Sequence, residues 1–289
     1  MKPAPFTYHR AHSVAEAVAL LAELGDEAKI LAGGLSLVPM MNFRLARPTA
    51  LVDVSRIEGL SYLRAGAAGE LRVGALTTHR TVEISRDPVV LRDFGVLPRS
   101  ARWIGHYPIR SRGTFGGSIA HADPASEWCL LAVLLDAQVV LTGPDGPRTV
   151  PAAGFFEGYY STAAAPDEMI TEIRFPAPAR RAVLTEFAPR QGDFAVVAAA
   201  VSADIADGVC RHGRVVLGGV GPLPVEVDAV PLAGQPATAE TWRAMGEHAA
   251  RQIDPPDDTH GDAEFRRRLT ATLVCRALAE ACHPGRDDG

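Results

Sequence analysis

The spacing of apolar residues near the N-terminus predicts a helix over residues 13–25, because they recur on one helical face. Ser13 and Glu16 match the capping box that begins many helices, and Gly25 is placed to end this one. A short apolar run at 29–31 predicts a buried strand after the helix.

The rest of the chain alternates between strand and helix patterns and ends in strands followed by helices. This order favours an α+β fold, with a linker at 176–181 that two prolines interrupt. The further expected elements are a helix or turn at 36–45, strands near 50–55, 71–75, 168–176, 182–189, 194–205 and 213–220, helical segments near 77–84, 89–105, 238–252 and 262–282, and a helix running into a strand over 128–143. We expect the run Arg266–Arg268 on the solvated face of the last helix, and the last six residues, 284–289, to be frayed.

Two pairs of adjacent glycines interrupt these patterns, in "ILAGGLSLVPMMNFRL" at 30–45 and in "GTFGGSIAHADP" at 113–124. Glycine adopts positive φ angles and lets another group approach the backbone closely. A strand, two glycines and a helix can therefore present successive backbone N–H groups to a phosphate. Two such arrangements, called amide nests below, would suit a diphosphate. A single glycine pair is more often a tight turn. Neither pair matches the dinucleotide or nucleoside triphosphate fingerprints.

Composition and charge narrow the class of protein. The 289 residues are 47% hydrophobic and 22% charged, which is ordinary for a globular chain. The net charge of −5 gives no electrostatic basis for binding nucleic acid or an anionic membrane. With no apolar leader and no long apolar window, we expect a cytoplasmic protein without a membrane span. Cys129, Cys210, Cys275 and Cys282 form no ligand pattern, so we expect reduced, mostly buried thiols and no metal site.

The remaining polar candidates are weaker. His121 and Asp123 would suit an acid–base pair, but no nucleophile motif accompanies them, and a structural role is the commoner one. We interpret Asp53 as a cap of the turn that follows its strand. Arg110 and Arg112 precede the second glycine pair, where they would neutralise a phosphate or meet an acidic partner, although a place on the solvated surface is the commoner one for arginine. No catalytic residue is expected.

Together, "AGGLSLVPMMNFRLARPTALVDVSRI" and "IRSRGTFGGSIAHADPASE" resemble the FAD-binding medium subunits of molybdenum hydroxylases. That family includes aerobic carbon monoxide dehydrogenase and xanthine dehydrogenase. The segments "GALTTHR" at 74–80, "TVPAAGFFEGYYST" at 149–162, "DEMITEIRFP" at 167–176 and, more weakly, "RQGDFAVVAAAV" at 190–201 extend the resemblance over nearly the whole chain.

The resemblance implies the fold of vanillyl-alcohol-oxidase-like (PCMH-type) flavoproteins with a small C-terminal α+β domain. The implied FAD-binding domain is 1–176, with subdomains at about 1–55 and 56–176 that hold the cofactor between them. The implied C-terminal domain, a three-stranded sheet with helices, is 177–289.

The resemblance also implies FAD as cofactor and assigns its contacts residue by residue. The glycine segments clasp the diphosphate and ribityl chain, Ile104 and Gly105 lie near the flavin, and Glu127 contacts FAD. Ile170 is a candidate for packing on the adenine, and Phe194 for a place near the isoalloxazine ring. The cofactor-binding residues so implied are Ile30, Leu31, Ala32, Gly33, Gly34, Leu35, Ser36, Leu37, Ile104, Gly105, Thr114, Phe115, Gly116, Gly117, Ser118, Asp123, Glu127, Ile170 and Phe194.

The chain departs from the family pattern at two places. Many relatives have histidine where this chain has Leu35. Relatives often carry lysine and paired basic residues just before "GDFA", where this chain has Glu186 and Pro189. A cationic contact to the flavin from that segment is therefore not implied here.

The resemblance implies two partners, an iron–sulfur small subunit and a molybdopterin large subunit, in a heterotrimer or its dimer. Electrons would pass from the iron–sulfur clusters through the FAD to an external acceptor. Two alternatives remain at this stage. One is a self-contained flavin oxidase of related fold, and the other is a non-catalytic nucleotide-binding or assembly module that has lost the flavin.

Overall fold

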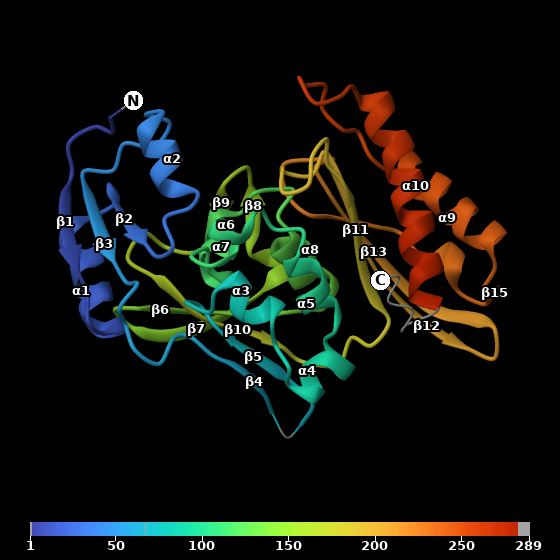
Figure 1. Ribbon diagram of the computed structural model, residues 1–289, viewed down its shortest axis with the longest axis horizontal. Helices are drawn as coiled ribbons and strands as arrows, with labels where there is room; N and C mark the ends of the chain where they lie inside the picture. The colour runs from blue at the N-terminus through green and yellow to red at the C-terminus, as the bar shows by residue number, and fades with distance from the viewer. Residues whose placement is uncertain (1, 67, 283–289) are drawn as a thin grey trace.

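The computed structural model describes residues 2–66 and 68–282 and arranges them as three units in a row (Figure 1). The N-terminal unit is blue in Figure 1, the central unit runs from cyan to yellow-green, and the C-terminal unit runs from yellow to red. Residues 284–289, which we expected to be frayed, lie outside the described residues.

A small parallel sheet forms the N-terminal unit, with strand order β1-β3-β2. Its elements are β1 (Thr7–Arg10), α1 (Val14–Leu24), β2 (Ala28–Leu31), α2 (Leu37–Asn42) and β3 (Ala50–Asp53). The Ser13 hydroxyl accepts a hydrogen bond from the Glu16 amide, and Gly25 ends α1 with φ 74°, so the predicted caps are confirmed. The expected buried strand at 29–31 exists, but only Ala28 of β2 is buried, because β2 is an edge strand.

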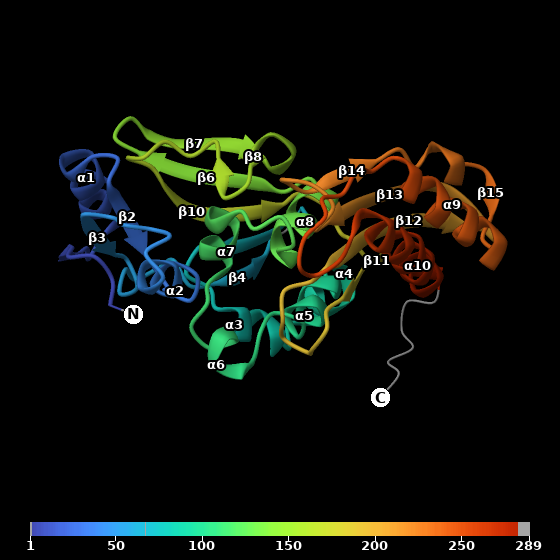
Figure 2. The ribbon, with the colours of Figure 1, turned by 90° about the horizontal axis from the view of Figure 1, so that it is seen from above.

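The central unit is built on a five-stranded antiparallel sheet with strand order β4-β5-β10-β6-β7 (Figure 2). Its strands are β4 (Leu63–Ala65), β5 (Leu71–Gly74), β6 (Gln138–Gly143), β7 (Gly146–Pro151) and β10 (Met169–Phe175), with a separate hairpin of β8 (Phe156–Gly158) and β9 (Ser161–Thr162). Its helices are α3 (His79–Glu83), α4 (Pro88–Asp93), α5 (Val96–Ala101), α6 (Tyr107–Arg110), α7 (Phe115–His121), α8 (Glu127–Leu134) and the 3₁₀ turn η1 (Ala152–Gly154).

Aromatic packing holds the core of the central unit. Phe115 stacks on Trp128 with ring centroids 4.5 Å apart and meets the edge of Phe175. Every residue of α8 after Glu127 is buried, which explains why its sequence is apolar on all sides. The unbroken apolar pattern over 128–143 turns from helix to strand at Asp136, whose φ is 52°.

Two predictions for the central unit differ from the structure. The segment 89–105 forms two short helices, α4 and α5, with Phe94 and Gly95 between them. The second glycine pair lies within the first turn of α7, not in a turn between a strand and a helix. Thr114, which caps α7, is not part of a named strand and forms a single isolated β-bridge with Thr78.

The C-terminal unit is an antiparallel sheet, β11-β12-β13-β14, that is buried on both faces. Ala198 and Ala200 of β12 face the core of the central unit, and Ala199 and Val201 face the helices α9 and α10. This explains the continuous apolar run in the sequence of β12. Its elements are β11 (Ala182–Phe187), β12 (Val197–Ala206), β13 (Val209–Gly218), β14 (Val225–Val227), η2 (Val230–Leu232), β15 (Gln235–Pro236), α9 (Ala239–Arg251) and α10 (Ala263–Cys282).

One expectation about α10 is wrong. Arg266 is 4% exposed rather than solvated, and its guanidinium donates to the carbonyl oxygens of Val196 and Gly219 and to Asp258. The neighbouring Arg268 behaves as expected, with an exposed ion pair to Glu264. Arg266 therefore ties α10 to the end of the sheet.

All four cysteines are free thiols, two buried and two partly buried. Across residues 2–66 and 68–282, no helix is long and apolar enough to cross a membrane. In that same part of the chain, no group of three or more histidine, cysteine, aspartate or glutamate side chains is placed to hold a metal ion.

Candidate functional site

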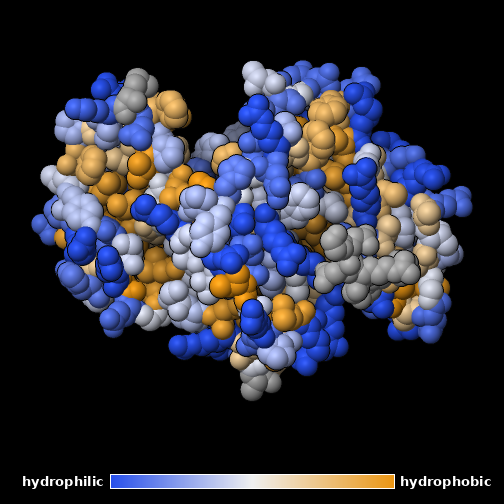
Figure 3. All heavy atoms as spheres, viewed as in Figure 1, coloured by the Kyte–Doolittle hydropathy of each residue, from blue (hydrophilic) through white to orange (hydrophobic). Residues whose placement is uncertain are grey.

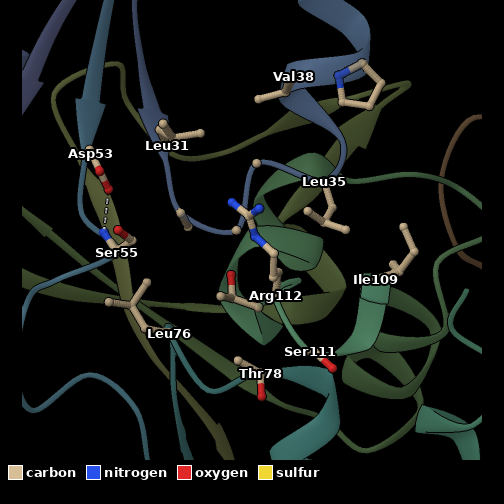
Figure 4. A pocket seen from close by; sticks show the side chains of 15 residues that line it. Leu31, Leu35, Val38, Asp53, Ser55, Leu76, Thr78, Ile109, Ser111 and Arg112 are labelled. Atoms are coloured by element: carbon tan, nitrogen blue, oxygen red, sulfur yellow. Dashed lines mark hydrogen bonds between the residues drawn. The ribbon is translucent and has the colours of Figure 1, made fainter. Parts of the chain in front are cut away.

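A cavity of about 610 Å³ lies where the N-terminal and central units meet. Figure 3 shows the surface hollowed between these two units, with hydrophobic residues in the hollow. The first glycine segment forms one wall, and the segment that leads into α7 forms the opposite wall (Figure 4). The lining residues are Leu31, Ala32, Gly33, Gly34, Leu35, Val38, Pro39, Asp53, Ser55, Leu76, Thr78, Ile109, Ser111, Arg112 and Thr114.

The first glycine segment presents free backbone N–H groups beside this cavity. Strand β2 ends at Leu31 and α2 begins at Leu37, and Gly34 turns the chain between them with φ 73°. The amides from Ala32 to Leu37 donate no hydrogen bond to any described part of the chain. A run of unengaged amides is the backbone arrangement that binds phosphate oxygens.

Arg112 adds a positive charge to the opposite wall. Its side chain extends from the segment before α7 toward the glycine loop (Figure 4). Its guanidinium makes no hydrogen bond or ion pair with residues 2–66 or 68–282, whereas Arg80 and Arg110 both pair with Glu83. Arg110 differs, because it pairs with Glu83 at 2.8 Å and donates to the Gly105 carbonyl at 2.7 Å. Of the two arginines, only Arg112 faces the cavity.

The second glycine pair does not form an amide nest, so that part of the prediction is wrong. The Gly116 amide donates to the Ala75 carbonyl, and the Gly117 amide donates to the Thr114 hydroxyl. The amides of Phe115 and Ser118 are also engaged by the protein. Position 116 requires glycine, because a Cβ there would lie 2.6 Å from the Cβ of Ala75. Of the residues 114–118, only Thr114 lines the cavity.

A second group of expected residues lies away from the cavity, toward the C-terminal unit. A Cβ on Gly192 would lie 3.1 Å from the Gly105 carbonyl carbon, so the "GDFA" loop contacts the segment after α5. Ile104 is partly buried against the central core. Phe194 lies on the same loop and is 73% exposed.

Glu127 and Glu186 come together at this boundary. On β11, Ala182 and Leu184 face the central core, and Glu186 shares their face by strand alternation. Burial, together with the charges of Glu186 and Asp123, raises the pKa of Glu127 well above its ordinary value. Burial raises the pKa of Glu186 to about 7, and its Oε2 atom is buried without a described hydrogen-bond partner.

The remaining expected residues pack in the core or form hydrogen bonds within the protein. The Phe115 ring is fully buried, and Ile170 is 8% exposed within the central core. Asp123 accepts a hydrogen bond from the Ala125 amide in the turn before α8. The Ser118 hydroxyl bonds that of Ser126. None of these side chains lines the cavity, and their contacts with FAD stay a prediction.

Comparison with known proteins identifies the family. The model described as the FAD binding domain in molybdopterin dehydrogenase matches residues 4–178. The chain belongs to this family. The CO dehydrogenase flavoprotein C-terminal domain matches residues 182–281. This FAD-binding chain is thus a medium-type oxidoreductase subunit of the molybdenum hydroxylases, and the expected family, fold class and cofactor are confirmed.

Relatives align over almost their full length. The carbon monoxide dehydrogenase medium chain of Hydrogenophaga pseudoflava is 37% identical, with 97% of this chain and 98% of that one covered. The 6-hydroxypseudooxynicotine dehydrogenase complex subunit alpha of Paenarthrobacter nicotinovorans is 36% identical, with 99% and 97% covered.

Solved structures of similar proteins have the same overall fold. The carbon monoxide dehydrogenase from Hydrogenophaga pseudoflava that lacks the Mo-pyranopterin moiety superposes with a TM-score of 0.92 at 38% identity, covering 98% of this chain and 99% of that one. Quinoline 2-oxidoreductase from Pseudomonas putida 86 superposes with a TM-score of 0.91 at 33% identity, covering 97% and 98%.

Sequence reasoning missed two features of the cavity. The sequence does not separate Arg112 from its neighbour Arg110, because no local pattern shows that Arg110 pairs with Glu83 and Arg112 does not. Asp53 was interpreted correctly as a cap, since it accepts from the Ser55 amide at 2.8 Å, but it also lines the cavity. Its place beside the glycine loop follows from the parallel pairing of Leu31 with Asp53, which the sequence does not display.

Proposed function

We propose that this chain is the electron-transfer flavoprotein subunit of a molybdopterin-dependent hydroxylase or dehydrogenase. Its partners would be an iron–sulfur small subunit and a molybdopterin large subunit. FAD, when bound, supplies a redox centre that receives electrons from iron–sulfur clusters on a partner and passes them to an external acceptor. The protein's own task is to bind the cofactor, fix its place and leave one side open to the acceptor.

The observation that carries the binding step is the run of unengaged amides from Ala32 to Leu37, of which Ala32 to Leu35 line the same cavity as Arg112. Backbone N–H groups and a guanidinium both suit diphosphate oxygens, and neither has to leave a protein partner first. The cavity therefore fits the diphosphate of FAD. Thr78 and Thr114, which cap α3 and α7, close its floor.

We further propose that residues 1–176 form the FAD-binding domain, with subdomains at about 1–55 and 56–176, and that 177–289 form the C-terminal domain. The cavity between the first two units supports this division. Contacts of FAD with Ile104, Gly105, Glu127 and Phe194 would place the flavin end near the boundary with the C-terminal unit.

Reconstitution with the two partner chains tests the electron-transfer role. The assembled complex, given the hydroxylase substrate, is expected to reduce the external acceptor. Omitting this chain should abolish that reduction, while an artificial dye should still accept electrons from the molybdenum and iron–sulfur chains. Equal reduction of the natural acceptor without this chain would contradict the proposal. Turnover of a small substrate by this chain alone would instead identify a self-contained oxidase.

A further inference from the structure

The surface around helix α2, at the top of the N-terminal unit in Figure 1, exposes apolar side chains beside arginines. Phe43 and Leu45, in the turn that ends the helix, are 66% and 76% exposed, and Val38 is 43% exposed. Arg44 and Arg47 are exposed in the same turn. We call these five residues the α2 surface. Exposed apolar residues that lie together with arginines are typical of protein–protein interfaces.

The turn after α2 contains strain that the helix end itself does not require. The Arg44 amide donates to the Met41 carbonyl, and the Leu45 amide donates to the Met40 carbonyl, both at 2.9 Å. This pair of bonds is a Schellman motif, whose left-handed position is usually glycine. Here Arg44 occupies it with φ 59°. The next residue usually packs on the helix, yet Leu45 is mostly exposed. The turn therefore presents both side chains to the outside.

The two arginines of this turn carry charge that no nearby carboxylate neutralises. In the part of the chain that the structure describes, neither forms an ion pair. Arg44 donates only to the Lys2 carbonyl, at 3.4 Å, and Arg47 only to the Arg44 carbonyl, at 3.1 Å. Residues 28–52 contain no aspartate or glutamate, although the whole chain has a net charge of −5. The α2 surface is thus a basic region of an acidic protein, and it complements a partner surface that carries carboxylates.

Helix α2 also borders the cavity. Leu35, just before the helix, and Val38 and Pro39 within it line the cavity wall. An α-helix with its side chains is about 10–12 Å wide, so a partner on the α2 surface would lie about one helix width from the cavity. Electron transfer slows steeply with distance. The partner that this position suits best is therefore one that delivers electrons to a cofactor in the cavity.

We propose that the α2 surface binds the electron-donating partner chain, and that the matching face of that partner is an apolar pocket ringed by carboxylates. Phe43 and Leu45 fill the pocket, since large buried side chains dominate binding energy. Arg44 and Arg47 pair with the carboxylates. The inference rests on the proposed function, in which the electron donor is an iron–sulfur chain. An anionic membrane also attracts basic apolar surfaces, but the net negative charge of this chain opposes it.

Affinity for the iron–sulfur chain, measured by calorimetry with the FAD-loaded full-length protein, tests the inference. Leu45→Ser and Phe43→Ser are each expected to weaken binding about tenfold or more. Arg44→Gly should weaken binding about tenfold at low salt and less at high salt. The same variant should not lower the Tm, because glycine adopts the left-handed conformation without strain. A purely structural role of Arg44 would instead leave the affinity unchanged.

Two variants in the C-terminal unit are matched controls. Val230→Ser changes an apolar residue that is 75% exposed, and Arg243→Gln changes an exposed arginine on α9. Both should bind the iron–sulfur chain like the wild type. The three variants of the α2 surface should retain the FAD content of the wild type, because none of the substituted side chains lines the cavity.

Wild-type affinity in all three variants of the α2 surface would overturn the inference, as would an equal loss in the controls. So would variants that impair binding to the molybdopterin chain, to vesicles containing phosphatidylserine or to a second copy of this chain, and not to the iron–sulfur chain. Loss of FAD and a lower Tm in all three variants would show that the surface is structural. Each of these results leaves the proposed function intact, whereas a wild-type protein that binds no iron–sulfur chain would remove it.

Discussion

The carbonyl oxygen of Arg112 lies only 2.3 Å from the position that a Cβ on Gly33 would occupy. The first glycine segment and the segment before α7 are therefore in backbone contact at this point. Gly33 is required for the fit between two units, whereas Gly34 is required for a turn with φ 73°. The two glycines of one pair thus serve different purposes.

Gly33→Ala is expected to lose FAD while keeping the rest of the fold. The added methyl must push the glycine loop away from Arg112, which separates the amides from the guanidinium. Flavin absorbance per chain measures the loss. Gly154→Ala is the control, because a Cβ there meets nothing within 4 Å and its φ is not positive. Wild-type FAD content in Gly33→Ala would refute this account of the contact.

Arg112→Gln should weaken FAD binding about tenfold, equivalent to about 1.4 kcal/mol, by removing a charge from the cavity wall. Because screening weakens exposed charges, the difference from wild type should shrink as salt is raised. Fluorescence titration with FAD at low and high salt measures both effects. Arg243→Gln, on the exposed face of α9, should bind FAD normally. Unchanged affinity in Arg112→Gln would remove this residue from the site.

Glu186→Gln should stabilise the protein at pH 8. The unfolded glutamate releases its proton near its ordinary pKa of 4.5, and the folded one releases it near 7. Between these values the folded state binds more protons, so stability falls as pH rises through this window. Glutamine does not titrate, so the free energy of unfolding of the variant should exceed that of the wild type by on the order of 1–3 kcal/mol above pH 7. Below pH 4.5 the two should differ little.

Thermal unfolding at several pH values measures the effect, with Glu247→Gln on α9 as the control. A variant whose Tm follows the wild-type pH profile would show that Glu186 is not an ionisable buried group. A Tm gain that is the same at all pH values would indicate altered packing instead.

Arg266→Ala is expected to lower the free energy of unfolding by about 3–5 kcal/mol, because it leaves the buried Val196 carbonyl and the partly buried Gly219 carbonyl without their donor. Arg268→Ala, two positions further along α10, should cost less than about 1 kcal/mol, since its pair with Glu264 is exposed. Urea unfolding of both variants gives the comparison. Similar losses at the two positions would contradict the buried role of Arg266.

The sequence predicted those elements whose signal is local. Helix α1 has a cap, an apolar face and a terminating glycine, and all three features are present in the structure. The edge strands β1 and β7 were missed, because half-exposed strands such as "TYHR" carry no continuous apolar run. Their place is decided by pairing with distant strands, which a local pattern does not contain.

The candidate site shows the same division. The first glycine loop was identified correctly as a source of free amides, because a strand end, a positive φ and a helix start are all local. The second was misread, since its amides are taken by Ala75 and Thr77, about forty residues earlier in the chain. The burial of Arg266 also depends on carbonyl groups from another element, which no charge pattern reveals.

Hydrogen exchange tests the central claim most directly. In the flavin-free chain, the unengaged amides from Ala32 to Leu37 should exchange rapidly, and those of 115–118 should be protected. On adding FAD, the account predicts strong new protection at 32–37 and little change at 115–118. Saturating FAD that leaves the 32–37 amides exchanging as before would contradict the claim that this loop holds the diphosphate.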